Sequence, residues 1–192
     1  MTTNRNLTIK TLFVTVGSTK FEKLINKILK TDILNLLKSF NFKKIILQVG
    51  AGVHDDDDLF NFKEKNTFST SNNEIVKFFK ENVEVIAYRY KSSIKEDMQN
   101  ADLVISHAGS GSVLESLEAN KKLIVVVNDA LMDNHQLELA EKMFDEGYLL
   151  YTNCDGLADK IELINNQEFK LKKYVPGNPR NFGTFLKNLM AN

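Results

Sequence analysis

The chain has 192 residues, which is enough for one domain with a sizeable core but too few for two full domains. Lysine and arginine together number 25, as do aspartate and glutamate, so the formal net charge is zero and no overall field favours nucleic acid or an anionic membrane as a partner. The hydrophobic content of 43% is typical of a globular protein and excludes a disordered chain.

The sequence carries no targeting signal and only one cysteine. The longest apolar runs, such as 123–127, are too short to span a bilayer, and the first ten residues lack the apolar core of a secretion signal. Cys154 cannot form an internal disulfide, which fits a reducing compartment and a packed or partly exposed thiol. The composition therefore predicts a soluble, cytosolic domain that does not insert into a membrane.

Each of the first two strand signals ends in a glycine-bearing turn. Residues 11–16 form a short β-rich run, which the Gly-Ser-Thr sequence at 17–19 follows. Apolar residues then recur at helical spacing over 21–40, as one long helix or as two short ones. Residues 44–49 predict the next strand, which the Gly-Ala-Gly sequence at 50–52 closes.

The stretch 54–73 is the least regular part of the chain. His54 and the four aspartates after it resemble a site for a hard cation, because such cations take carboxylate ligands. Consecutive aspartates cannot all converge on one ion, however, so we interpret this run as a solvated loop.

The rest of the chain alternates between helix and strand signals. Ser93 and Glu96 have the spacing of a capping box before a helix, and Gly147 stands where a helix would end. Helices are expected over 75–79, 94–100, 113–120, 137–146 and 157–164, and strands over 83–88, 101–105, 123–127 and 149–151. Short apolar strands that alternate with helices predict an α/β fold with a doubly wound, Rossmann-like parallel sheet covered on both faces.

The only two prolines, Pro176 and Pro179, mark the end of this domain. We therefore divide the chain into a domain of residues 1–175 and a C-terminal segment of residues 176–192. Pro179 suits the first position of a helix, and the apolar residues after it fall on one helical face. This face either packs back on the domain or docks on a partner chain.

The sequence ADLVISHAGSGSVLE at 101–115 carries the strongest functional signal. An apolar strand is followed by a histidine, a run of small residues and the start of a helix. Glycines let the backbone approach a ligand, and the N–H groups at a helix N-terminus attract anions. A lone Gly-x-Gly is also compatible with an ordinary turn between a strand and a helix.

His107 and Glu115 are the candidate catalytic residues of this motif. His107 either forms a structural hydrogen bond or donates one to a phosphate oxygen, which it does best when protonated. Glu115 follows about one helical turn into the helix, where it could reach a sugar hydroxyl beside the anion.

Three small or polar stretches follow strands and should meet at the carboxyl edge of a parallel sheet, where open α/β sheets bind ligands. Two of them supply N–H groups and hydroxyls for a diphosphate. The third supplies neutral groups that suit sugar hydroxyls, although its histidine could also act as a helix-cap partner. The candidate donor-binding residues are Gly17, Ser18, Thr19, Gly109, Ser110, Gly111, Ser112, Glu115, Asn134, His135 and Gln136.

Sites for a diphosphate, a ribose and a hexose together indicate a nucleotide sugar. The sequence has no Walker lysine and no complete GxGxxG motif, so neither ATP nor NAD is indicated.

Three stretches resemble the catalytic-subunit family of the two-subunit UDP-N-acetylglucosamine transferase that acts on a dolichyl-diphosphate sugar: VTVGSTKFEKLI, ADLVISHAGSGSVLESL and LMDNHQLELAEKMFDEGYL. The resemblance covers about residues 11–165. The chain is also similar to the C-terminal half of the bacterial N-acetylglucosaminyltransferase that completes the peptidoglycan lipid precursor. That enzyme is of the GT-B type, so the resemblance implies the donor-binding half of a GT-B glycosyltransferase.

The resemblance also implies how the donor is held. The glycine-rich loop would bind the diphosphate, the acidic residue on the next helix would bind the ribose, and the pair that ends in glutamine would contact the sugar. In this chain these are Ser110, Gly111 and Ser112; Glu115; and His135 with Gln136. The turn at 17–19 would face the same phosphates, and residues 90–94 would lie near uracil.

The acceptor-binding half of a GT-B enzyme is missing, so the resemblance implies a membrane-anchored partner subunit that binds the lipid acceptor. The implied reaction is inverting transfer of N-acetylglucosamine from UDP-N-acetylglucosamine to N-acetylglucosaminyl-diphospho-dolichol, for N-glycosylation, at the cytosolic face of the endoplasmic reticulum. No cofactor or metal is expected, because helix N-termini and hydroxyls would stabilise the leaving diphosphate. A non-catalytic nucleotide-sugar-binding module and a sugar-nucleotide epimerase or hydrolase are the alternatives.

Overall fold

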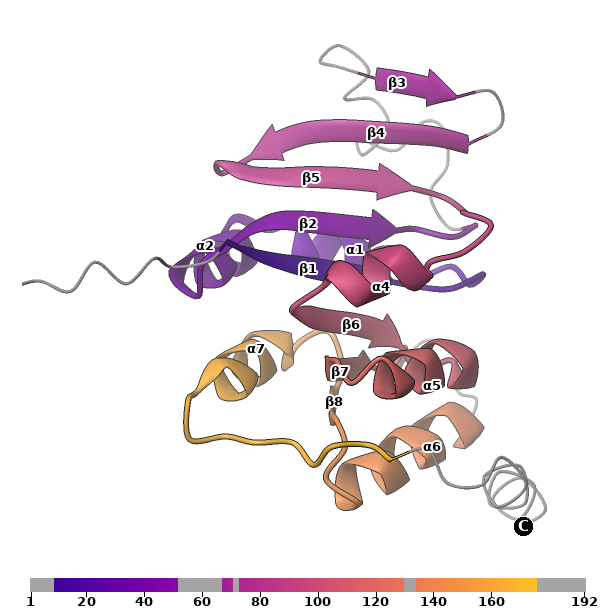
Figure 1. Ribbon diagram of the computed structural model, residues 1–192, viewed down its shortest axis with the longest axis vertical. Helices are drawn as coiled ribbons and strands as arrows, with labels where there is room; N and C mark the ends of the chain where they lie inside the picture. Colours follow the sequence, from indigo (N-terminus) through magenta and orange to yellow (C-terminus); the bar gives the residue numbers. More distant parts are fainter. Residues whose placement is uncertain (1–8, 52–66, 71–72, 130–133, 176–192) are drawn as a thin grey trace, which may run out of the picture.

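In the part of the chain that the structure describes, eight strands form a single sheet in the order β3-β4-β5-β2-β1-β6-β7-β8 (Figure 1). The computed structural model describes residues 9–51, 67–70, 73–129 and 134–175. The strands are β1 (Lys10–Thr15), β2 (Phe42–Gln48), β3 (Thr67–Thr70), β4 (Asn73–Lys80), β5 (Val83–Tyr88), β6 (Leu103–His107), β7 (Lys122–Val126) and β8 (Leu150–Thr152). The helices are α1 (Glu22–Ile28), α2 (Thr31–Ser39), α4 (Lys95–Asn100), α5 (Ser110–Glu118), α6 (Asn134–Asp145) and α7 (Leu157–Asn165).

Six neighbouring strands, from β5 through β2, β1, β6 and β7 to β8, are parallel. Alternate side chains of these strands point to opposite faces of the sheet and form two apolar cores, one on each face. Helices α1, α2 and α7 cover one face, where Leu24, Leu34 and Ile161 are fully buried. Helices α4, α5 and α6 cover the other face through residues such as Val113 and Met143. This part of the fold confirms the predicted α/β architecture.

The other two strands correct the prediction of an all-parallel sheet. Residues 75–79 were expected to be helical, but they lie in β4, which pairs antiparallel with both β3 and β5. Burial alternates along β4: Val76 and Phe78 are buried, whereas Phe79 is 71% exposed. Such alternation of β-branched and aromatic residues is the pattern of a strand with one buried face. Strand β3 also falls inside the stretch 54–73 that was expected to be irregular.

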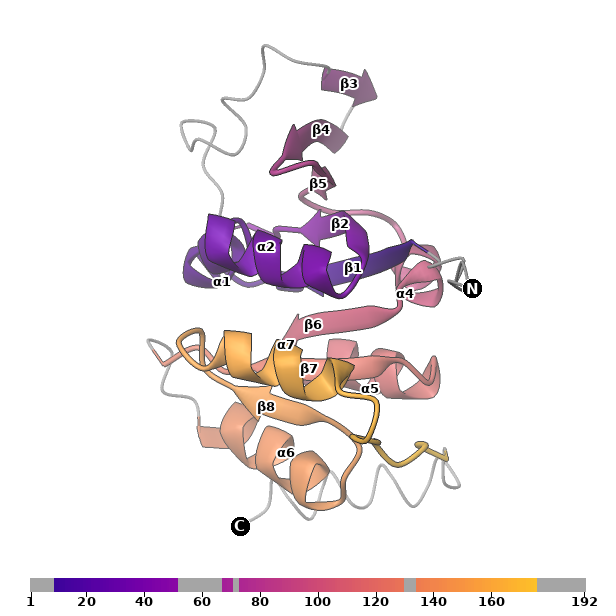
Figure 2. The ribbon, with the colours of Figure 1, turned by 90° about the vertical axis from the view of Figure 1, so that its left-hand side faces the viewer.

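Figure 2 shows β3 and β4 extending beyond the two helical layers. A two-residue turn, Glu81–Asn82, joins β4 to β5, since Lys80 pairs directly with Val83. Both turn residues have positive φ, of 49° and 61°. This is the backbone of a type I′ hairpin, whose twist matches that of the flanking strands.

Three smaller differences concern element ends. The helical pattern over 21–40 divides into α1 and α2. The capping box predicted at Ser93 and Glu96 is absent, because Ile94 is the N-cap and the Ser93 hydroxyl instead accepts a hydrogen bond from the Lys95 N–H at 3.2 Å. Strand β6 extends to His107, so this histidine is the last residue of the strand.

The described chain continues past α7 and packs back on the domain. Phe169 and Leu171 lie against the core on the α7 side, and the rings of Tyr174 and Tyr148 meet edge to face at 5.5 Å. The helix expected within residues 176–192 lies outside the described residues. No helix in the ranges that the structure describes is long and apolar enough to cross a bilayer.

The Glu81–Asn82 turn yields a stability prediction. Asn82→Val should lower the free energy of unfolding by about 1–2 kcal/mol, because a β-branched residue is strained at positive φ. Asn82→Gly is the matched control. Its free energy of unfolding should lie within about 0.5 kcal/mol of the wild-type value or above it, because glycine adopts positive φ without strain. Urea unfolding followed by circular dichroism measures both, and equal stability of the two variants would contradict the assigned turn.

Candidate functional site

The two glycine turns lie side by side at the carboxyl edge of the sheet. Strands β1 and β6 are neighbours in level register, with Thr15 paired to Ser106. The chain leaves β1 into the turn at Gly17 and leaves β6 into the turn at Gly109. Both turns therefore open on the same edge, as the sequence predicts for a doubly wound sheet.

The imidazole of His107 fills the space between these turns. A Cβ atom placed on Gly17 would lie 2.6 Å from Cε1 of His107, and one placed on Gly109 would lie 2.2 Å from Nε2. Neither position can accept a side chain while the ring stays in place. Glycine is therefore needed at both positions to let two backbone turns close around one ring.

His107 is buried and uncharged. Only 8% of the residue is exposed, and its Nδ1 is buried with no hydrogen-bond partner among the described residues. Burial lowers the pKa of His107 more than the facing Thr15 backbone raises it. The ring is therefore neutral at neutral pH in this ligand-free chain, and since a neutral imidazole keeps one N–H to donate, a hydrogen bond from His107 to a phosphate oxygen stays a prediction.

Gln48, which the sequence analysis did not single out, fixes the first glycine turn. The residue lies at the end of β2 and is 4% exposed. Its Oε1 accepts hydrogen bonds from the Thr15 hydroxyl and, at 3.1 Å, from the Gly17 N–H. Its Nε2 donates to the Gly17 carbonyl at 2.7 Å and to the Arg89 carbonyl at 3.3 Å. One buried amide thus holds the turn after β1 and the start of the loop after β5.

The first turn does not itself begin a helix. Gly17 has a φ of 59°, and the Thr19 hydroxyl donates to the Val16 carbonyl at 2.8 Å, so this hydroxyl stabilises the turn. Helix α1 begins only at Glu22. The expectation that Gly17, Ser18 and Thr19 sit at a helix N-terminus is therefore wrong, although their position at the edge beside His107 is as predicted.

The second turn does begin a helix. Gly109 is the N-cap of α5, and no side chain caps the helix. Its first three residues, Ser110, Gly111 and Ser112, therefore carry N–H groups without helical partners, next to the positive end of the helix dipole. A Cβ atom on Gly111 would meet nothing within 4 Å. The protein itself does not require glycine there, which leaves that space open to a ligand.

Glu115 faces a pocket between α4 and α5. This pocket has a volume of about 460 Å³, and Ser93 and Lys95 also line it. An adjoining hollow of about 550 Å³ is lined by Lys91, Ser92 and again Ser93. The structure thus brings Glu115 next to the 90–94 loop, the segment that the resemblance associates with uracil.

A cluster of buried Tyr88 and Asp97 with the more exposed Lys91, also missed in the sequence, holds this loop. Tyr88 is fully buried, and its hydroxyl donates to Asp97 Oδ2 at 2.6 Å. Lys91 Nζ donates to the same oxygen at 2.7 Å and lies 4.3 Å from the centre of the Tyr88 ring. Burial and the Asp97 carboxylate raise the pKa of Tyr88, so the hydroxyl stays protonated as a donor. The cluster ties the start of the loop to α4.

The third predicted stretch opens α6. Asn134, His135 and Gln136 are the first residues of this helix, which follows β7, the neighbour of β6. The backbone therefore begins α6 on the same side of the sheet edge as the glycine turns, while the side chains of these three residues lie outside what the structure describes.

No group of three or more His, Cys, Asp or Glu side chains suited to a metal ion occurs within the described ranges, and the run at 54–58 lies outside them.

Sequence comparisons agree with this geometry. The profile of the glycosyltransferase family 28 C-terminal domain matches residues 11–182. The UDP-N-acetylglucosamine transferase subunit ALG13 of Kluyveromyces lactis is 35% identical over 173 residues, which cover 82% of this chain and 87% of that protein. The subunit ALG13 of Mus musculus is 44% identical over 150 residues, and the match spans 78% of this chain but only 11% of that longer protein.

Solved structures give the same relationship. An NMR solution structure of ALG13 has a TM-score of 0.64 and 29% identity, covering 93% of this chain and 95% of that one. The crystal structure of Acinetobacter baumannii MurG has a TM-score of 0.54 at 16% identity and covers 95% of this chain and 42% of that one. At this level of identity the second likeness is one of fold alone.

The contacts of Gln48 predict that its loss loosens the first glycine turn. Gln48→Leu should lower the free energy of unfolding by about 2–4 kcal/mol, because it leaves buried Gly17 and Thr15 groups without partners. The exposed Gln167→Leu is the control and should change it by less than about 0.5 kcal/mol. Urea unfolding gives the energies, and a wild-type value for Gln48→Leu would show that the amide does not hold the turn.

The lowered pKa of His107 predicts a pH dependence. The unfolded chain takes up a proton at this ring near its ordinary pKa of 6.5 while the folded chain resists protonation, so stability is lost as the pH falls through and below that value. His107→Gln should reduce the loss measured by urea midpoints between about pH 7.5 and about pH 5.5.

The other two histidines provide the control for this experiment. A His54→Gln/His135→Gln variant should keep the wild-type slope, since His107 remains. If that control flattened the slope and His107→Gln did not, the assignment to His107 would be wrong.

Proposed function

Because the chain belongs to the family of glycosyltransferase family 28 C-terminal domains, within its UDP-N-acetylglucosamine transferase subunits, we propose that it binds UDP-N-acetylglucosamine as the donor half of a glycosyltransferase. The observation that carries the proposal is the pair of glycine turns closed around His107, with the uncapped N-terminus of α5 beside them. This arrangement presents backbone N–H groups and hydroxyls to an anion without any protein carboxylate in the first turn of α5.

The proposed reaction depends on stabilising the leaving diphosphate. Negative charge grows on UDP as the bond to the sugar breaks, and the N–H groups of Ser110, Gly111 and Ser112 meet that charge with the helix dipole behind them. The neutral His107 ring supports the same region through the two turns and its single N–H. Each well-placed donor is worth about 3 kcal/mol of barrier.

The remaining groups orient the rest of the donor. In this proposal Glu115 accepts hydrogen bonds from the ribose hydroxyls, and the 90–94 loop, held by Tyr88, Asp97 and Lys91, lies against uracil. The opening residues of α6, Asn134 to Gln136, contact the N-acetylglucosamine ring. The pocket between α4 and α5 supports the placement of the ribose and uracil, since Glu115 and Ser93 of the 90–94 loop both line it.

The acceptor side of the reaction lies with a partner. We propose that a membrane-anchored subunit binds N-acetylglucosaminyl-diphospho-dolichol and completes the site at the cytosolic face of the endoplasmic reticulum. The reaction inverts the anomeric configuration of the transferred sugar. Residues 1–175 form the donor domain, and residues 176–192 form the segment that docks on that subunit.

Gly111→Ala separates donor binding from folding. The added methyl group meets no protein atom, and alanine favours helix, so the free energy of unfolding should stay equal or rise by about 0.5–1 kcal/mol. The same methyl group enters the space assigned to the diphosphate, so affinity for UDP should fall by about tenfold or more. Calorimetric titration with UDP measures the affinity, and transfer of radiolabelled N-acetylglucosamine with the co-expressed partner subunit measures activity.

Two outcomes of this experiment discriminate between functions. Wild-type binding and transfer by Gly111→Ala would place the diphosphate elsewhere and end the proposal. Binding of UDP-N-acetylglucosamine without any transfer, even with the partner present, would favour a non-catalytic nucleotide-sugar-binding module.

A further inference from the structure

A large groove opens at the edge of the sheet opposite the glycine turns. It has a volume of about 1250 Å³. Lys10 and Lys122, which line it, are the first residues of β1 and β7, and Asn41 directly precedes β2. The groove therefore lies at the amino ends of the strands, away from the carboxyl edge that holds the candidate donor site.

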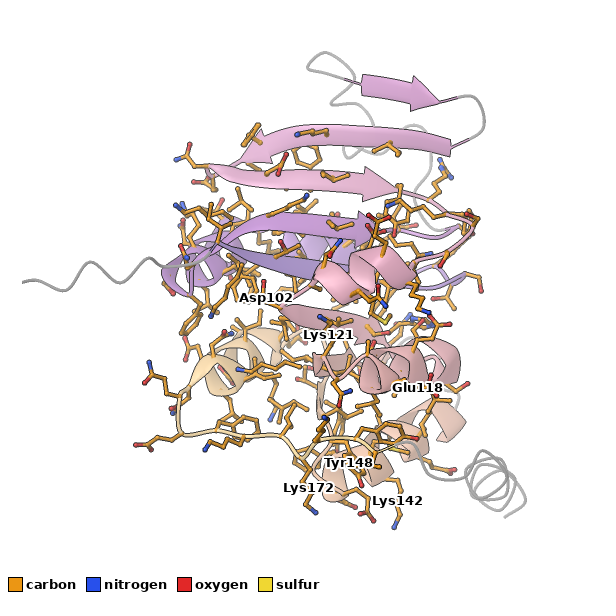
Figure 3. All side chains as sticks on the ribbon, viewed as in Figure 1. Asp102, Glu118, Lys121, Lys142, Tyr148 and Lys172 are labelled. Carbon is orange, nitrogen blue, oxygen red and sulfur yellow. The ribbon has the colours of Figure 1, made fainter. Side chains whose placement is uncertain are left out.

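The chain after α7 forms one wall of this groove. The Lys172 N–H donates to the Gly147 carbonyl at 2.8 Å, and Tyr174 packs edge to face on Tyr148. Figure 3 shows Lys121, Tyr148 and Lys172 on the side of the molecule that this segment crosses. The wall is therefore fixed to the domain by a backbone hydrogen bond and by aromatic packing.

The described lining of the groove is strongly basic. It contains no aspartate or glutamate among the described residues, but it contains seven lysines: Lys10, Lys38, Lys121, Lys122, Lys170, Lys172 and Lys173. Residues 1–8 and 176–192, which continue the chain from the two described ends nearest the groove, also contain no aspartate or glutamate. The zero net charge of the whole chain thus hides a local excess of positive charge.

Most of these ammonium groups are not neutralised by the protein. Lys121 Nζ donates to the Gln99 carbonyl and Lys122 Nζ to the Ile164 carbonyl at 2.9 Å. The other five lysines make no ion pair with any carboxylate in the described part of the chain. Burial and the nearby positive charge of Lys10 both lower the pKa of Lys122, which shows that like charges are held close together here. A bound anion would relieve this repulsion.

We propose that this groove binds a ligand that carries several phosphate groups. Lysine presents a point charge on a flexible stem, which suits phosphate oxygens in varied positions. Phe40, Tyr148 and Phe169 supply apolar wall between the lysines, as in a site for a compact molecule. The ligand is either a soluble polyphosphate or the phosphorylated headgroup of a lipid. The site is separate from the donor site and does not depend on its function.

Binding assays with two probes test whether the groove binds phosphate groups and distinguish a soluble polyphosphate from a lipid headgroup. The full chain is titrated with inositol hexakisphosphate, and separately it is sedimented with phosphatidylcholine vesicles with and without a phosphatidylinositol phosphate. A triple variant, Lys170→Gln/Lys172→Gln/Lys173→Gln, should weaken binding by about tenfold or more, given roughly one tenfold step for every one to two lysines near bound phosphate. Binding should also weaken as salt is raised.

Two control variants make the test specific. Lys30→Gln/Lys80→Gln/Lys142→Gln removes the same charge from outside the groove lining and should bind within about twofold of the wild type. Glu115→Gln alters the donor pocket and should leave this binding unchanged, so failure of the donor proposal and failure of this one are distinguishable.

The two assays decide between a soluble ligand and a lipid headgroup. Groove-dependent binding of inositol hexakisphosphate without vesicle binding assigns a soluble ligand, and groove-dependent binding to the phosphoinositide vesicles assigns a lipid headgroup. Equal losses of binding in the groove and control variants, or no binding to either probe, would overturn the proposal.

Discussion

The level parallel pairing of β1 with β2 and β6 is the constraint on which the candidate site depends. Thr15 pairs with Gln48 on one side and with Ser106 on the other, so three chain segments leave the sheet at the same height. The packing of differently shaped apolar side chains in the two cores fixes this register, because a shift by one residue would move each side chain into the opposite core, where it does not fit. The polar groups at the strand ends are therefore positioned by the two cores rather than by their own contacts.

The strand register does not by itself determine the shape of the turns. Buried side chains at the ends of the strands determine it. Gln48 binds both the N–H and the carbonyl of Gly17, and His107 occupies the space that two absent side chains leave. The cluster of Tyr88, Asp97 and Lys91 performs a similar task for the neighbouring loop. Gln48, Tyr88 and Asp97 are buried and hydrogen-bonded to backbone or charged partners, as buried polar groups usually are, whereas Nδ1 of His107 has no partner among the described residues.

Much of this arrangement could be predicted from the sequence, because short apolar strands, glycine turns and amphipathic helices are local signals. The pattern of strand, turn and helix was sufficient to predict that Gly17 and Gly109 would lie at one edge. The antiparallel strand β4 was missed because Ile75, Val76, Phe78 and Phe79 satisfy both a helical and an alternating pattern over so short a window. Only pairing with β5 decides between them, and pairing is not a local property.

The buried polar side chains at the strand ends, Gln48 and Tyr88, were missed for a related reason. A lone glutamine at the end of the apolar run KIILQV, or a tyrosine at the end of VEVIAY, has no partner in its own segment. Gln48 acts on residues 31 and 41 positions away. Nor does a net charge of zero reveal that lysines from both halves of the chain gather at the amino edge, since that requires the strand order.

The contact of His107 with both glycines has a consequence for how this sequence can vary. The imidazole at position 107 excludes a methyl group at both position 17 and position 109. Replacement of the ring by a smaller side chain would make room at position 109, but the positive φ at position 17 would still disfavour any other residue. The order in which substitutions arise therefore matters, and the same change is damaging in one background and tolerated in another.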